Sequence, residues 1–170
     1  MHKTSPKTVV CHDVFWNLQR VPVKKLVYRP SIYGVLVEKN KVLLSRQWDG
    51  YDFPGGGGYK HEMIEQTLER EFWEETGLKV SVGLPIWCSS SFFTFRNHNK
   101  SVHAICIYFL CKRIGGTITD KNLVGEELNY AKKPEWIDVR RISKIKFYNS
   151  LKKDNLTIIK RSLALKKISH

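Results

Sequence analysis

Three glutamates within residues 71–75 are spaced so that they would share one side of a helix. Glu71, Glu74 and Glu75 stand at positions i, i+3 and i+4, and side chains with that spacing are neighbours on a helix surface. Gly77 follows where a helix can end, because glycine tolerates the left-handed conformation of a C-cap. Carboxylates in a last turn face the negative end of the helix dipole, which costs about 0.3–1 kcal/mol each.

A divalent cation would offset this unfavourable arrangement of charge. Arg70 can pair with Glu74 four residues later, but one guanidinium cannot neutralise three carboxylates. Hard cations such as Mg²⁺ take oxygen ligands and usually keep waters or substrate phosphates in their remaining positions. The spacing therefore indicates a metal site, while helix chemistry alone leaves an ordinary solvated acidic face equally open.

The helix that would present these glutamates is predicted over residues 62–76. Ile64, Leu68 and Phe72 fall four positions apart, which gives an apolar stripe that can pack against a core. The acidic face is the neighbour of this stripe, so packing of the helix would position the carboxylates.

The longer stretch from residue 56 to residue 78 resembles the Nudix box. That motif reads Gly-x5-Glu-x7-Arg-Glu-U-x-Glu-Glu-x-Gly-U, where U is a bulky apolar residue. The preceding Phe53-Pro54-Gly55 is similar to the usual lead-in, and His61 stands where family members often have glycine but occupies no fixed position. Every fixed position is matched, by Gly56, Glu62, Arg70, Glu71, Phe72, Glu74, Glu75, Gly77 and Leu78.

The resemblance implies the Nudix fold, an α/β class in which an α/β/α sandwich contains a mixed β-sheet. On physical grounds, the order of apolar patterns also predicts a layered α+β or α/β domain. We expect one domain over residues 1–170, with a loose segment at about 1–7 and a basic helix at about 154–168. Strands are predicted over 8–16, 23–28, 32–37, 41–46, 78–82, 86–95, 102–111 and 135–139, with a hairpin loop at 38–40, a long loop at 47–61, a turn at 96–100 and a loop or hairpin from 115.

The resemblance also implies a reaction and a cofactor. Family members usually cleave a nucleoside diphosphate linked to another group, and we expect Mg²⁺ or Mn²⁺ as the cofactor. Metal ions neutralise the dense charge of adjacent phosphates and orient the attacking water. By resemblance, Glu71, Glu74, Glu75 and the Gly56 carbonyl are the metal ligands, and Arg70 holds the glutamates in place.

Three further carboxylates are candidates for supporting or catalytic roles. Glu62 either reaches the metals through water or supports the loop. Glu126 and Glu127 precede Glu135-Trp136-Ile137, which resembles the late strand of many Nudix enzymes. Either glutamate could be the general base, since a loop carboxylate can approach a metal-bound water without occupying a ligand position on the helix. A solvated acidic turn is an equal alternative.

Residues on both sides of the glycine-rich segment are candidates for substrate binding. Arg46 ends a predicted strand that leads into this segment, and Arg29 has similar standing; each could bind phosphate or be a solvated strand end. Trp48, Tyr51 and Phe53 could stack on a base, although covering the core beneath the loop is somewhat favoured.

Secondary motifs narrow the substrate by elimination. Family members that hydrolyse ADP-ribose often carry a proline beyond the box, and dinucleoside-polyphosphate enzymes a tyrosine, whereas this chain reads Phe93-Thr94-Phe95. The first candidate substrate is therefore a nucleoside triphosphate, including an oxidised one, and the second is the 5′ end of RNA. A non-catalytic nucleotide-sensing or RNA-binding module is a third class, although such modules usually lose box glutamates that this chain retains.

Composition adds broad limits. The formal net charge of +13 over 170 residues favours anionic partners, such as nucleotides or RNA, over a neutral surface; a basic proteome would explain it equally well. No apolar run approaches the length of a membrane span, so no membrane partner is expected. None of the four cysteines form a Cys-x-x-Cys pair, which favours reduced thiols in a cytoplasmic protein. The oligomeric state is left open between monomer and homodimer.

Overall fold

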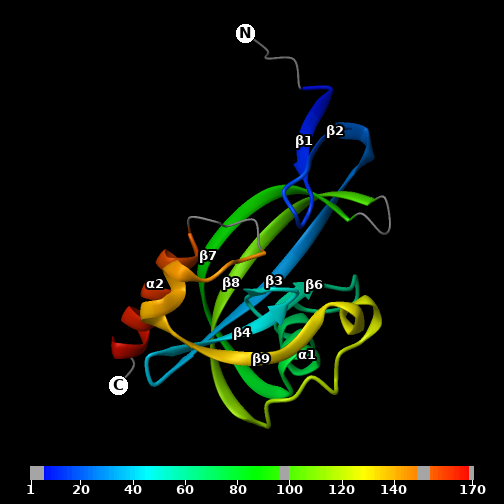
Figure 1. Ribbon diagram of the computed structural model, residues 1–170. Helices are drawn as coiled ribbons and strands as arrows, with labels where there is room; N and C mark the ends of the chain where they lie inside the picture. The colour runs from blue at the N-terminus through cyan, green and yellow to red at the C-terminus, as the bar shows by residue number, and fades with distance from the viewer. Residues whose placement is uncertain (1–5, 96–99, 149–153, 169–170) are drawn as a thin grey trace.

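A computed structural model describes residues 6–95, 100–148 and 154–168, and it is built around one curled, mixed β-sheet (Figure 1). The α-helices are α1 (Ile64–Thr76) and α2 (Asn155–Ile168), and the short 3-10 helices are η1 (Val23–Lys25), η2 (Gly125–Asn129) and η3 (Val139–Lys144). The strands are β1 (Thr8–His12), β2 (Leu18–Pro22), β3 (Leu26–Glu38), β4 (Lys41–Gln47), β5 (Gly50–Asp52), β6 (Gly55–Gly57), β7 (Leu78–Phe95), β8 (Lys100–Gly116) and β9 (Ala131–Asp138).

The two longest strands of the sheet, β7 and β8, lie at its centre. They pair antiparallel with each other, and β8 also pairs in parallel with β3. The strand order is β2-β1-β7-β8-β3-β4-β5, with β6 paired to β3 and β9 to β4. The β1–β2 hairpin therefore forms one edge of the sheet, and it stands at the top of Figure 1.

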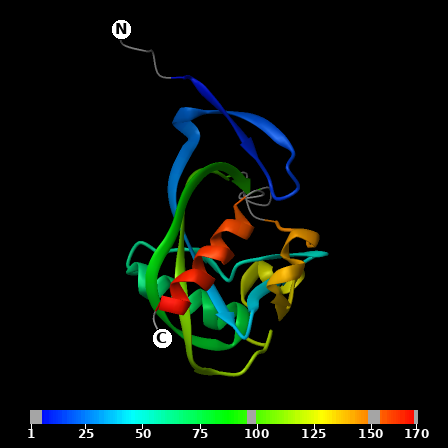
Figure 2. The same ribbon diagram turned by 90° about the vertical axis from the view of Figure 1, so that its left-hand side faces the viewer.

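Alternate side chains of β3 belong to two apolar layers on opposite faces of the sheet. Ile32 and Leu36 lie in the cluster that contains α1, whereas Val35 and Val37 lie in the cluster that contains α2. This alternation follows from the two-residue period of a strand, whose successive side chains point to opposite faces. Figure 2 views the molecule from the side of α2. The helix residues in these layers are Leu68 and Phe72 of α1, and Ile158 and Ile159 of α2.

The predicted helix carrying the glutamates is present, and it begins two residues later than expected. Met63 is its N-cap; the Met63 N–H donates to Gln66 Oε1 at 2.8 Å, and its carbonyl accepts from the Thr67 N–H at 3.0 Å. The helix ends at Gly77, whose φ of 72° is left-handed as predicted. The prediction of an α/β fold with a mixed sheet is confirmed.

Several strand boundaries differ from prediction. The strands expected over 78–82 and 86–95 are one strand, because pairing with β8 continues through register shifts between Val82 and Trp87. The strand expected over 8–16 stops at His12, the one expected over 23–28 begins as η1, and the long loop at 47–61 contains β5 and β6. Most of the turn expected at 96–100 (residues 96–99) lies outside the described residues, and so does most of the loose segment expected at 1–7 (residues 1–5). Within the described residues, no helix is both long enough and apolar enough to cross a membrane.

Candidate active site

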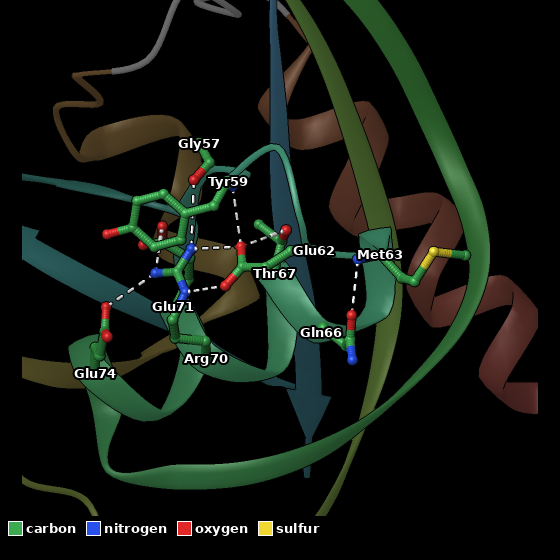
Figure 3. Close-up of polar contacts among 9 residues, drawn as sticks. All are labelled: Gly57, Tyr59, Glu62, Met63, Gln66, Thr67, Arg70, Glu71 and Glu74. Carbon is green, nitrogen blue, oxygen red and sulfur yellow. Dashed lines mark hydrogen bonds and ion pairs between the residues drawn. The ribbon is translucent and has the colours of Figure 1, made fainter.

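The Arg70 guanidinium ties the loop before α1 to the acidic residues of the helix (Figure 3). Its Nε and Nη2 donate to the two carboxylate oxygens of Glu62, at 2.7 and 3.0 Å. Its Nη1 donates to Glu71 at 2.9 Å and to Glu74 at 3.1 Å. One side chain therefore organises three carboxylates, and these contacts support the positioning role predicted for Arg70.

Glu62 is held by the loop and the first turns of the helix. Besides Arg70, its carboxylate accepts from Thr67 Oγ1 at 2.9 Å and from the Tyr59 N–H at 3.1 Å. The hydrogen bonds from Arg70 are the main reason that the pKa of Glu62 is lowered to about 2. These contacts favour the loop-supporting alternative for Glu62.

The glycine segment runs against the Glu71 carboxylate. Strand β6 pairs with β3, with Gly56 opposite Ile32, and this places the Gly56 main chain beside α1. A Cβ on Gly56 would lie 2.6 Å from a carboxylate oxygen of Glu71, so only glycine permits this approach. The Glu71 side chain is buried, and burial raises its pKa, while the Arg70 guanidinium opposes that rise.

Glu75 is the most enclosed carboxylate of the helix. Its Oε2 accepts from Ser45 Oγ at 2.6 Å and from the Gly55 N–H at 3.0 Å. Burial raises the pKa of Glu75 well above its usual range, and the nearby Glu127 raises it further. The carboxylate is thus fixed in orientation, but its negative charge is not neutralised by a cation among these contacts.

Helix η2 brings a further carboxylate to the site. It begins at Gly125, whose φ of 57° is in the left-handed region, and it carries Glu127. The Glu127 Oε2 atom is buried and has no hydrogen-bond partner among the described residues. Burial raises the pKa of Glu127 to about 7, and the charges of Glu71 and Glu74 add to this effect.

Three of these carboxylates form a compact group. Glu71, Glu75 and Glu127 each offer one oxygen, and these oxygens lie within 4.8 Å of one another. Oxygen donors of this charge and spacing suit a hard divalent cation and the water molecules that it keeps, and the unpartnered oxygen of Glu127 could contact either. The residues present therefore fit Mg²⁺ or Mn²⁺. Glu74 lies outside this group and bonds to Arg70 instead.

A pocket of about 310 Å³ connects the carboxylates with aromatic side chains. Its volume is within the range of small-molecule sites. Gly56, Glu75, Glu126 and Glu127 all line it. The aromatic residues that line the same pocket are Phe15, Tyr33, Trp48, Phe93, Phe95, Tyr130 and Tyr148.

The predicted substrate-binding residues divide into two pairs. Arg29 and Trp48 line the pocket. Arg46 and Tyr51 are not among its lining residues, and both bind Glu135: Arg46 Nη1 lies 2.6 Å from Oε1, and the Tyr51 hydroxyl donates to Oε2 at 3.0 Å. Arg46 and Tyr51 are register partners on β4 and β5, whereas Trp48 lies in the turn between these strands, where its positive φ interrupts the extended backbone.

Trp48 and Phe53 also have different environments. The Trp48 ring stacks on Tyr130, with ring centroids 4.4 Å apart, and the backbone N–H of Trp48 donates to the backbone carbonyl of Tyr130 at 3.0 Å. Its φ of 47° is left-handed, which is uncommon for a bulky residue and persists only where the surroundings enforce it. Phe53 is 1% exposed and packs in the core beside Tyr108, as the core-covering alternative expected.

Sequence reasoning missed several residues of the site. Ser45 is a single serine in a strand, and nothing local signals that it faces Glu75. The contribution of Asp13 and Phe15 to the pocket was hidden by the assignment of residues 8–16 to one strand, although an aspartate followed by Asn17 is a turn signal.

Comparisons with known proteins agree with this geometry. The NUDIX domain family matches residues 27–157. An RNA pyrophosphohydrolase of Actinobacillus pleuropneumoniae is 28% identical over 129 residues, which cover 68% of this chain and 60% of that protein. An ADP-ribose pyrophosphatase of Methanocaldococcus jannaschii is 28% identical over 124 residues, covering 69% and 66%. An 8-oxo-dGTP diphosphatase of Buchnera aphidicola is 32% identical over 59 residues, covering 31% and 45%.

The aligned part of the chain spans only about 60% of the length of the RNA pyrophosphohydrolases. Solved structures show the same fold at low sequence identity. An ADP-ribose pyrophosphatase from Streptococcus suis has a TM-score of 0.58 at 15% identity, covering 85% of this chain and 96% of that one. A MutT protein from Methanosarcina mazei has a TM-score of 0.55 at 20% identity, covering 84% and 98%. Since the family match spans most of the chain and includes α1 with its glutamates, this protein belongs to the NUDIX domain family.

Proposed function

We propose that this protein is a metal-dependent pyrophosphohydrolase whose preferred substrates are nucleoside triphosphates, including oxidised ones. The observation that carries the proposal is one pocket lined both by Glu75 and Glu127, two members of the carboxylate group, and by aromatic side chains. A nucleotide needs both features, because its phosphates require a bound cation and its base offers an aromatic face.

The carboxylates of α1 would hold the metal. Glu71 and Glu75 are the primary ligands in this proposal, with Glu74 and the Gly56 carbonyl retained as ligands on the basis of the motif. A bound Mg²⁺ or Mn²⁺ would neutralise phosphate charge and acidify a water molecule. Arg70 keeps the ligand oxygens in place through its contacts with Glu71 and Glu74.

Glu127 is favoured over Glu126 as the general base. Its carboxylate lies with Glu71 and Glu75, whereas Glu126 is an exposed residue at the wall of the pocket. Burial raises the pKa of Glu127 to about 7 in the metal-free protein, and a cation bound beside it would lower that pKa, which leaves a charged carboxylate able to accept a proton near neutral pH. Glu127 accepts the proton of the attacking water at the carboxylate that includes the unpartnered Oε2.

Arg29 and Trp48 are the proposed substrate contacts outside the box. Arg29 Nη1 donates to Ser31 Oγ at 2.7 Å, and its guanidinium lies 5.1 Å from the Phe95 ring centroid. These contacts hold a cation at the pocket wall. We place the phosphate contact at Arg29 rather than at Arg46, since Arg46 is paired with Glu135.

The decisive experiment is hydrolysis of a substrate panel with Mg²⁺ or Mn²⁺. The panel contains the common nucleoside triphosphates, 8-oxo-dGTP, ADP-ribose and 5′-triphosphorylated RNA, and Glu75→Gln serves as the inactive control. Faster release of monophosphate and pyrophosphate from a nucleoside triphosphate supports the proposal. Preference for ADP-ribose, or binding without hydrolysis of any member, would contradict it.

The 5′ end of RNA is the second candidate substrate. The net charge of +13 and the similarity to RNA pyrophosphohydrolases favour it. If basic residues bind a polynucleotide, affinity for triphosphorylated RNA should fall steeply as salt increases, because neutralised phosphates release counterions. An RNA affinity that salt leaves unchanged would remove this candidate.

A further inference from the structure

We propose that Phe15, in the turn between β1 and β2, stacks on the nucleobase of the substrate and thereby contributes to its selection. The proposal rests on the proposed function in that the pocket accepts a nucleotide. Phe15 precedes the family match at residues 27–157, yet it lines the same pocket as Glu75 and Glu127. The hairpin at the sheet edge would thus supply a part of the site that the matched residues lack.

The turn that carries Phe15 is closed by its own hydrogen bonds. Asp13 is buried, and its Oδ1 accepts from the N–H groups of Phe15 at 2.8 Å and Asn17 at 2.9 Å. The Asp13 N–H donates to the Asn17 carbonyl at 3.1 Å. An aspartate that bonds the backbone ahead of it fixes a turn, so the backbone at Phe15 is held in place before any ligand binds.

The turn is also docked onto the main sheet. His12 and Trp16 stack with ring centroids 4.2 Å apart, and His12 meets the edge of Phe93 at 5.4 Å. His12 and Phe93 are also register partners where β1 pairs in parallel with β7. Phe93 itself lines the pocket. The hairpin turn is therefore positioned relative to the pocket by ring contacts and by main-chain pairing.

The Phe15 ring extends an aromatic surface at the pocket. Its centroid lies 5.5 Å from that of Trp48 and 6.3 Å from that of Tyr148. Phe15 is 52% exposed while it lines the pocket. Stacking on a base covers apolar surface and adds an interaction between aromatic faces. Preorganisation of the turn lowers the cost of ordering this contact.

The inference is tested by comparing ligands that carry a base with one that lacks it. The four deoxynucleoside monophosphates, which are reaction products, are titrated calorimetrically into the full chain with Mg²⁺ and compared with 2-deoxyribose 5-phosphate. We expect the wild type to bind at least one monophosphate more tightly than the sugar phosphate. Phe15→Ala should weaken that monophosphate about tenfold and leave the sugar phosphate unchanged.

Matched variants separate stacking from structure. Phe15→Tyr keeps a ring and should retain the preference, whereas Phe15→Leu keeps apolar bulk without a ring and should lose most of it. Leu18→Ala removes another exposed apolar side chain of the hairpin, away from the pocket lining, and should bind as the wild type does. The inference is overturned if Phe15→Ala weakens the binding of the monophosphate and of the sugar phosphate equally, or if Phe15→Leu keeps the full preference for the monophosphate. The proposed function is tested separately, by hydrolysis with the wild type.

Discussion

Glu75 and Glu127 present carboxylate oxygens within 4.8 Å of each other, although one side chain belongs to α1 and the other to η2. Neither is exposed, and the charge of Glu127 raises the pKa of Glu75. Two carboxyls held together in a low-dielectric site cost free energy, whether they stay charged or take up a proton, unless a cation offsets the charge. The metal-free protein should therefore store unfavourable energy here that a divalent ion removes.

The first prediction is that Mg²⁺ or Mn²⁺ raises the melting temperature. An ion at about 100 times its Kd stabilises a protein by about 2.7 kcal/mol, which corresponds to about 5–10 °C for a domain of this size. Differential scanning calorimetry in EDTA and in excess Mn²⁺ measures the shift. In Glu75→Gln the shift should largely disappear, while the metal-free variant melts no lower than the wild type. An unchanged shift in this variant would show that the ion binds elsewhere.

The second prediction concerns catalysis by the same residue. Glu75→Gln keeps the shape of the side chain and removes a ligand charge, so kcat for the best substrate should fall by at least about 100-fold, beyond the 10–100-fold expected of a residue that only supports a ligand. Glu65→Gln changes an exposed glutamate of the same helix outside the fixed motif and should be nearly silent. Steady-state kinetics measure both; comparable losses would mean that only the helix as a whole matters.

The helix and its glutamates were predictable because their determinants are local. Spacing along one helix fixes which of Glu71, Glu74 and Glu75 are neighbours, and Gly77 marks the end of the helix. The apolar runs at 32–37 and 41–46 likewise located β4 and the second half of β3. The same helical spacing anticipated the pair between Arg70 and Glu74. It does not contain the approach of Glu127, from a distant segment, to Glu71 and Glu75.

The wall of the pocket was not predictable, since it depends on contacts between distant segments. Ser45 meets Glu75 only because β4 lies beside α1, and Phe15 reaches the pocket only because β1 pairs with β7. Arg46 and Tyr51 were grouped with Trp48 by proximity in sequence, yet both face Glu135. Trp48 lies in the turn between β4 and β5, where its positive φ directs the side chain independently of the strand pattern, and sequence spacing alone does not reveal that turn geometry.

The third prediction distinguishes the two loop glutamates. Glu127→Gln should lower kcat by at least about 100-fold, the lower end of what proton transfer to a positioned base contributes, and should change KM little. Glu126→Gln is the matched control, since its side chain is exposed on the same short helix, and it should retain most of the activity. Single-turnover kinetics separate the chemical step from product release. If Glu127→Gln is active and Glu126→Gln is not, the assignment must be reversed.

The fourth prediction uses the pH dependence of the ion pair between Glu62 and Arg70. The folded pKa of Glu62 is about 2, below its ordinary value of 4.5. A carboxyl with a lowered folded pKa stabilises the fold above the unfolded value and loses that contribution as the pH falls toward the folded value. Glu62→Gln should therefore reduce the free energy of unfolding by about 1–3 kcal/mol at pH 7, the worth of hydrogen bonds to a charged group.

The difference between wild type and Glu62→Gln should shrink as the pH decreases from 4.5 toward 2. Other carboxylates also titrate in this range, so the test compares the two proteins at each pH, where contributions from distant groups cancel. Urea unfolding in EDTA measures the difference without interference from metal binding. Glu65→Gln, on an exposed position near the start of α1, should show almost no difference from wild type at any pH. A constant loss of stability in Glu62→Gln from pH 7 to pH 3 would mean that its contacts with Tyr59 and Thr67 hold the loop, independent of the charge paired with Arg70.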